Sequence, residues 1–121
     1  MTPHRPRVQT DARARDPRLR GRTYAVPFAR VWDAAVALAN EMPRWRVTVT
    51  DEDRGLIQAE AETRFLGFVD DVTIRIRLDD NAWTRVDMLS ASRRGWTDFG
   101  TNRRRVLRFL ERLDARLGLT G

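Results

Sequence analysis

The fold is decided by the stretch Gly67-Phe-Val-Asp-Asp-Val-Thr-Ile-Arg-Ile-Arg-Leu78. Apolar and polar side chains alternate along it, which predicts a long strand with one covered and one solvent-facing side. A short turn leads into a second alternating segment that ends near Ser92. We therefore expect an antiparallel hairpin in which Ile76 lies opposite Val86. In that register Asp70 lies opposite Ser92, on the covered side.

Segments on either side of this hairpin also show strand and helix patterns. Alternation predicts strands at residues 22–26, 45–50 and 57–63. Apolar side chains at three- and four-residue spacing predict helices at residues 28–42 and 99–117. Consecutive strands joined by short turns form antiparallel meanders. We therefore expect an α+β fold, a two-layer, helix-grip-like sandwich of order β-α-β4-α, in which two helices pack on one face of a meander of about five strands.

The length of 121 residues is that of one domain. Residues 1–21 contain three prolines and six arginines but few large apolar side chains. Such a segment buries too little surface to offset the entropy lost on ordering. We expect a disordered basic arm over residues 1–21 and a single α+β domain over residues 22–121.

Composition narrows the possible chemistry. All 23 basic residues are arginine, cysteine is absent, and the one histidine, His4, lies in the expected arm. These facts leave no disulfide, no thiolate nucleophile and no Cys- or His-based metal site, so we expect neither a metal nor a cofactor. The chain has neither an apolar run long enough to cross a bilayer nor a recognisable secretory signal, and we expect a cytoplasmic protein.

Small polar groups are concentrated where the hairpin meets the last helix. An inward-facing Asp70 needs partners, because burying an unpaired carboxylate is costly. Ser90, Ser92 and Arg93 are the expected partners, and Asp98 is expected to cap the last helix. The candidate binding residues are Asp70, Asp71, Ser90, Ser92, Arg93, Asp98, Asn102 and Arg105.

Two interpretations of these residues follow. They form either a closed network that holds the sheet against the helix, or an anion-binding cleft built from hydroxyls, Arg93, Arg105 and a helix N-terminus. Asp70 and Asp98 would repel an anion, so we favour the network, within a small non-enzymatic binding or interaction domain. Catalysis is not expected because neither serine has a base nearby, and Asp70 and Asp71 point to opposite faces of the strand.

Arginine is concentrated at both ends of the chain. Residues 1–22 carry seven arginines and two acids, and residues 92–121 carry eight arginines and three acids, whereas the middle is net acidic. The alternative function is therefore binding of an anion or a nucleic acid through the last helix and the N-terminal arm. Glu60, Glu62 and Asp87 interrupt the exposed sheet face, so a protein or small anionic partner is favoured over nucleic acid.

Two motifs resemble a known family. The run Phe65-Leu-Gly-Phe-Val-Asp-Asp-Val72 is followed by Ser90-Ala-Ser-Arg-Arg-Gly-Trp-Thr-Asp-Phe-Gly-Thr-Asn102. Together they resemble the hallmark of the bacterial and plastid family catalogued as domain-of-unknown-function family 1499, over about residues 22–117. Leu89 departs from the pattern, since the family has an arginine there. The family has no established activity, so the resemblance implies no chemistry.

A weaker similarity concerns the first helix. The segment Val26-Pro-Phe-Ala-Arg-Val-Trp32 is similar to the start of lipid- and hormone-binding helix-grip domains. This similarity implies a second alternative, a small apolar ligand in a pocket between helix and sheet. The side chains expected to line such a pocket, or otherwise to form the core, are Trp32, Trp45, Met88 and Phe109.

Overall fold

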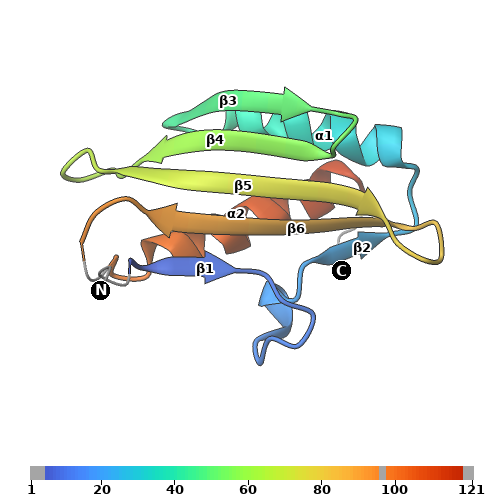
Figure 1. Cartoon of the computed structure of the whole chain (residues 1–121), viewed down its shortest axis with the longest axis horizontal. Coiled ribbons are helices and arrows are strands. Elements are labelled where there is room, and N and C mark those ends of the chain that lie inside the picture. Colours follow the sequence, from blue (N-terminus) through green and yellow to red (C-terminus); the bar gives the residue numbers. More distant parts are fainter. Residues whose placement is uncertain (1–4, 96–97, 119–121) are drawn as a thin grey trace.

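The computed structural model describes residues 5–95 and 98–118 (Figure 1). Its elements are β1 (Arg7–Gln9), the 3-10 turn η1 (Pro17–Leu19), β2 (Arg22–Tyr24), α1 (Phe28–Glu41), β3 (Trp45–Asp51), β4 (Leu56–Glu62), β5 (Val69–Leu78), β6 (Thr84–Ser92) and α2 (Thr101–Arg116). Over these residues the chain combines two α-helices with one antiparallel sheet, so the predicted α+β class is confirmed.

The sheet follows chain order from β3 to β6 and gains two short strands at one edge. Within the described residues it has six strands, in the order β1-β6-β5-β4-β3, with β2 also paired to β6. β1 pairs with one half of β6 and β2 with the other, so the two short strands share an edge. Figure 1 shows α1 and α2 lying behind the same face of the sheet, which is the predicted two-layer arrangement.

The central hairpin has the predicted register. Ile76 lies opposite Val86, and Asp70 lies opposite Ser92. Burial alternates along both strands, because successive side chains point to opposite faces. Asp70 therefore lies on the helix-covered side, at the end of the hairpin where α2 begins.

The N-terminal segment differs from the expected disordered arm. β1 pairs with β6, and η1 continues into β2. Thr10 is buried: its N–H donates to the carbonyl of Met88 at 2.9 Å, and its hydroxyl donates to Asp87 at 2.8 Å. The reason lies in β6, whose edge would otherwise expose unpaired backbone groups. Residues 1–4 of the expected arm lie outside the described residues.

The core lies between the sheet and the two helices. It combines the apolar faces of α1 and α2 with alternate residues of β4, β5 and β6. Trp32, Met88 and Phe109 are all buried in it, and Trp45 packs against it with its ring stacked on that of Phe109 at 5.4 Å. Three of the four side chains considered for an apolar pocket thus form the core.

Neither helix of the described chain has the length and apolarity required to traverse a bilayer.

Candidate functional site

The buried carboxylate of Asp70 contacts the last helix. Asp70 is 2% exposed, and its Oδ2 lies 2.7 Å from Nη1 of Arg105 in the second turn of α2. The same Nη1 also donates to Oγ of Ser90 and Oδ1 of Asn102, both at 3.1 Å. The predicted inward orientation of Asp70 is confirmed, and its cationic partner is Arg105.

Asn102 connects the remaining groups. Its Oδ1 accepts a hydrogen bond from Ser90 Oγ at 2.8 Å, and its Nδ2 donates to Ser92 Oγ at 2.9 Å. In the described part of the chain, no buried side-chain nitrogen or oxygen lacks a partner. We call this closed set the polar corner; its members are Asp70, Ser90, Ser92, Asn102 and Arg105.

Arg93 does not join the polar corner, contrary to the sequence-based prediction. It lies on the solvent-facing side of the sheet, where it contacts both Asp71 and Glu60. The reason is strand alternation: the residue after the inward-facing Ser92 points outward, as does the residue after Asp70. The hydrogen bonds that Arg93 donates to Asp71 and Glu60 raise the pKa of Arg93, and its guanidinium lowers the pKa of Glu60.

Asp98 supports the start of α2 from further upstream than an N-cap residue. The helix begins at Thr101, and the N-cap position is Gly100 with a left-handed φ of 78°. The Asp98 carboxylate accepts hydrogen bonds from the N–H of Gly100 at 2.9 Å and of Asn102 at 3.1 Å. Partial burial raises the pKa of Asp98, but these hydrogen bonds outweigh it and hold the pKa below its usual value.

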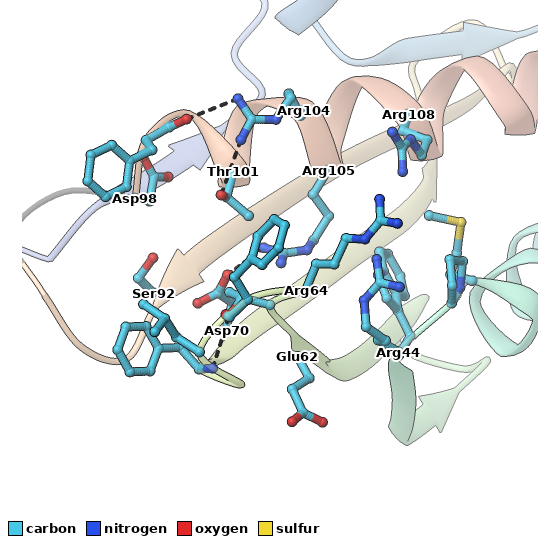
Figure 2. Close-up of a pocket in the computed structure, with 18 of the residues that line it drawn as sticks. Arg44, Glu62, Arg64, Asp70, Ser92, Asp98, Thr101, Arg104, Arg105 and Arg108 are labelled. Carbon is cyan, nitrogen blue, oxygen red and sulfur yellow. Dashed lines mark hydrogen bonds and ion pairs between the residues drawn. The ribbon is translucent and has the colours of Figure 1, made fainter.

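A cavity of about 470 Å³ opens beside the polar corner. It lies between the α1–β3 connection, the β4–β5 turn and the first two turns of α2 (Figure 2). Its lining residues are Met42, Pro43, Arg44, Trp45, Glu62, Thr63, Arg64, Phe65, Leu66, Phe68, Asp70, Ser92, Arg94, Asp98, Phe99, Thr101, Arg104, Arg105 and Arg108. Six arginines and three acids are among them, so the lining carries net positive charge.

Three of the arginines converge on the cavity. Figure 2 shows the side chains of Arg44, Arg64 and Arg108 pointing toward one another, while Glu62 points away. None of the three guanidinium groups has a hydrogen-bond or ion-pair partner among the residues that the structure describes, and all three residues are exposed. We call them the arginine cluster. Gathering like charges without a counter-charge is unfavourable, and an anion between them would remove that cost.

The edge of the cavity is apolar. Phe65, Leu66, Phe68 and Phe99 line it and are between 44% and 83% exposed. We call these four residues the apolar rim. They make up four of the seven exposed large hydrophobic side chains found over the described residues. Exposed apolar side chains gathered at one site are typical of a binding surface, whereas scattered ones are not.

Backbone strain is concentrated at the same place. The described non-glycine residues with positive φ are Arg44, Leu66, Ala82 and Phe99, and all but Ala82 line the cavity. This left-handed conformation is unfavourable for side chains with a Cβ, and such strain is found preferentially at ligand-binding sites. The cavity therefore combines unneutralised arginines, exposed apolar side chains and strained backbone.

Sequence reasoning found the polar corner but not the whole cavity. Thr101, Arg104 and Arg108 follow helical three- and four-residue spacing, and this pattern would have placed them with Arg105 on one face of α2. Arg44 and Arg64 carry no local signal. They come together because the N–H of Glu62 bonds to the carbonyl of Arg44 at 2.9 Å, which extends the β3–β4 pairing toward the cavity.

Comparison with known proteins identifies a family and no characterised relative. The family model described as a protein of unknown function (DUF1499) matches residues 1–113. That match includes the N-terminal segment, which the structure also places in the sheet. No curated protein and no solved structure matches the chain.

Proposed function

The chain belongs to the DUF1499 family of proteins of unknown function, and we propose that it is a small, non-enzymatic domain that binds an anionic ligand in its arginine-lined cavity. The observation that carries this proposal is the convergence of three arginines without acidic partners, from three separate segments, on one cavity.

The acids near the cavity do not argue against an anion. Asp70 is paired with Arg105, and the carboxylate of Asp98 faces the N–H groups at the start of α2. Glu62 points away from the arginine cluster. The positive charge of Arg44, Arg64 and Arg108 thus remains available to a ligand. Guanidinium groups suit this role, because their planar donors match the oxygens of a carboxylate or phosphate.

The polar corner is proposed to be the frame of this site. Its hydrogen bonds join β5 and β6 to α2 and fix the helix face that carries Arg108. When the groups that support a ligand site are already hydrogen-bonded in place, binding loses little conformational entropy in ordering them. The hydroxyls of Ser90 and Ser92 are engaged with Asn102, and among the residues that the structure describes no histidine, cysteine or lysine accompanies them, which supports binding rather than catalysis.

Nucleic-acid binding through α2 and the N-terminal segment has weaker support. Arg103 contacts Asp16, Arg93 contacts Asp71 and Glu60, and Arg104 donates to the carbonyl of Phe99. The guanidinium groups of these arginines already have partners in the protein, whereas nucleic acid requires a continuous surface of available charges. The cavity is also a concave site of small-molecule size.

The test compares two triple variants that remove equal charge. Arg44→Gln/Arg64→Gln/Arg108→Gln removes the arginine cluster, and Arg13→Gln/Arg15→Gln/Arg30→Gln removes three exposed arginines elsewhere. Titration calorimetry with inorganic pyrophosphate at low salt is the measurement. We expect the cluster variant to lose affinity by about tenfold or more, since each charge-assisted hydrogen bond contributes roughly 1.5–3 kcal/mol, while the control variant binds normally. Equal binding by both variants would refute the site.

A further inference from the structure

We infer that the ligand of this cavity is a single amphiphilic anion, a phosphate or carboxylate group that carries an alkyl chain. This inference rests on the proposed function, because the arginine cluster must bind the anionic group. It adds a role for the apolar rim, which is to cover the chain.

The two parts of the cavity differ in chemistry. The arginine cluster supplies charge from the α1–β3 connection, the β4–β5 turn and α2. The apolar rim comes from the tip of the β4–β5 turn and from the β6–α2 connection. A simple inorganic anion would use only the first part and leave the rim exposed to water. An anion with an alkyl chain satisfies both parts, because the chain removes the rim from water.

The two rim segments are held in place by side-chain hydrogen bonds. In the β4–β5 turn, the Thr63 hydroxyl donates to the carbonyl of Phe65 at 2.7 Å and accepts from the N–H of Phe68 at 2.9 Å. In the β6–α2 connection, Asp98 accepts from the N–H groups beyond Phe99. Both segments therefore present their apolar side chains in preformed positions. Such preformation lowers the entropic cost of binding.

The size of the cavity indicates one molecule rather than a membrane surface. Small-molecule pockets measure roughly 300–1,000 Å³, and this cavity, at about 470 Å³, falls within that range. The side chains of the arginine cluster point toward one another among the residues that line the cavity. A headgroup within a bilayer would have to leave its neighbours to reach it, whereas a single dispersed amphiphile would not.

The test uses paired probes that differ only in the chain. The protein, without added pyrophosphate, is titrated with inorganic phosphate, dodecyl phosphate, acetate and dodecanoate. The two chain-bearing anions are kept below their critical micelle concentrations. We expect at least one chain-bearing anion to bind about tenfold or more tightly than its chainless counterpart, because each buried methylene adds to the transfer free energy. The stronger of the two chain-bearing probes identifies the headgroup. Sedimentation with phosphatidylglycerol vesicles tests the membrane alternative.

Two double variants test the apolar rim. Phe65→Ser/Leu66→Asn alters the rim, with asparagine chosen because it tolerates left-handed backbone. Leu78→Ser/Trp83→Ser alters two exposed apolar side chains away from the cavity. The rim variant should bind inorganic phosphate normally but should no longer bind the alkyl-bearing anion more tightly than its chainless counterpart. The control variant should retain this difference in affinity. Circular dichroism melting verifies that both variants fold.

The outcomes separate this inference from the proposed function. Equal affinities within both pairs, phosphate with dodecyl phosphate and acetate with dodecanoate, would overturn the amphiphile and leave anion binding in place. Binding to vesicles that depends on the rim, without binding of dispersed dodecyl phosphate or dodecanoate, would overturn the single molecule in favour of a membrane surface. Absence of binding by every anion would overturn both proposals.

Discussion

Asp70 and Arg105 form a buried ion pair between the sheet and the last helix. Their Oδ2 and Nη1 atoms lie 2.7 Å apart, and only 3% and 8% of the two side chains is exposed. The pair ties α2 to β5 at the end of the sheet where the cavity opens. It also neutralises an acid that lines the cavity together with the arginine cluster, so loss of the pair would affect both the packing of α2 and the charge of the proposed site.

The Asp70–Arg105 pair predicts coupled losses of stability. Asp70→Ala and Arg105→Ala should each lower the free energy of unfolding by about 3 kcal/mol, because each leaves a buried charge without its partner. The double variant should lose less than the sum of the two, by about 1 kcal/mol or more. Urea unfolding at neutral pH measures all three values. Additive losses would show that the two side chains do not interact.

Tyr24 predicts a loss of stability in alkaline solution. Burial raises the pKa of Tyr24 above its usual value of about 10, and the hydrogen bond that its hydroxyl donates to Asp114 at 2.6 Å raises it further. Because the pKa is raised in the folded state, the protonated phenol contributes fully to the free energy of unfolding below about pH 10. This stabilisation is lost as the pH rises further, at up to about 1.4 kcal/mol per pH unit. Tyr24→Phe should lack this loss.

The composition makes the alkaline experiment specific. Tyr24 is the single tyrosine and the chain has no lysine, so few other groups titrate in this range. Urea midpoints measured from pH 9 to beyond pH 10 give the stability curve, and tyrosinate absorbance reports the ionisation of the folded protein. Appearance of tyrosinate with a midpoint near pH 10 in folded protein would contradict the raised pKa.

Thr10 tests whether the N-terminal segment is part of the fold. Its hydroxyl accepts from the N–H of Met88 at 3.0 Å and donates to Asp87. Thr10→Val should cost about 1–2 kcal/mol, because it leaves a buried N–H without this acceptor. Gln9→Ala is the matched control, since Gln9 is exposed and bonds only to Arg7 among the described side chains. Equal stability of the two variants would favour a disordered arm.

Gly55 tests the tight approach of the β3–β4 turn to β5. A Cβ at this position would lie 1.8 Å from the carbonyl oxygen of Ile76, and φ is +63°. Gly118 also has a positive φ, +77°, but open space around it. Gly118→Ala should therefore lower the free energy of unfolding by about 1–2 kcal/mol, the penalty for a side chain in left-handed backbone. Gly55→Ala should lower it clearly more, because the steric clash adds to this penalty. Thermal melting compares the two, and equal melting temperatures would exclude the steric clash.

The covered side of the hairpin could be predicted because strand alternation is a local property. The period of two sets which side chains face the helices, and one register then places Asp70 opposite Ser92. The partner of Asp70 could not be predicted in the same way. Arg93 directly follows Ser92, the residue opposite Asp70, but it lies on the solvent-facing side of the sheet. Arg105 instead reaches Asp70 from α2.

The fold class, the hairpin register and the inward orientation of Asp70 follow from local sequence patterns, because periodicity and turns specify which side chains are covered. Tertiary structure alone decided that Arg44, Arg64 and Arg108 share one cavity and that β1 joins the sheet. These arrangements depend on contacts between segments far apart in the chain. The charge of an arginine does not show which distant segment the side chain will meet. That is decided only when packing brings the segments together.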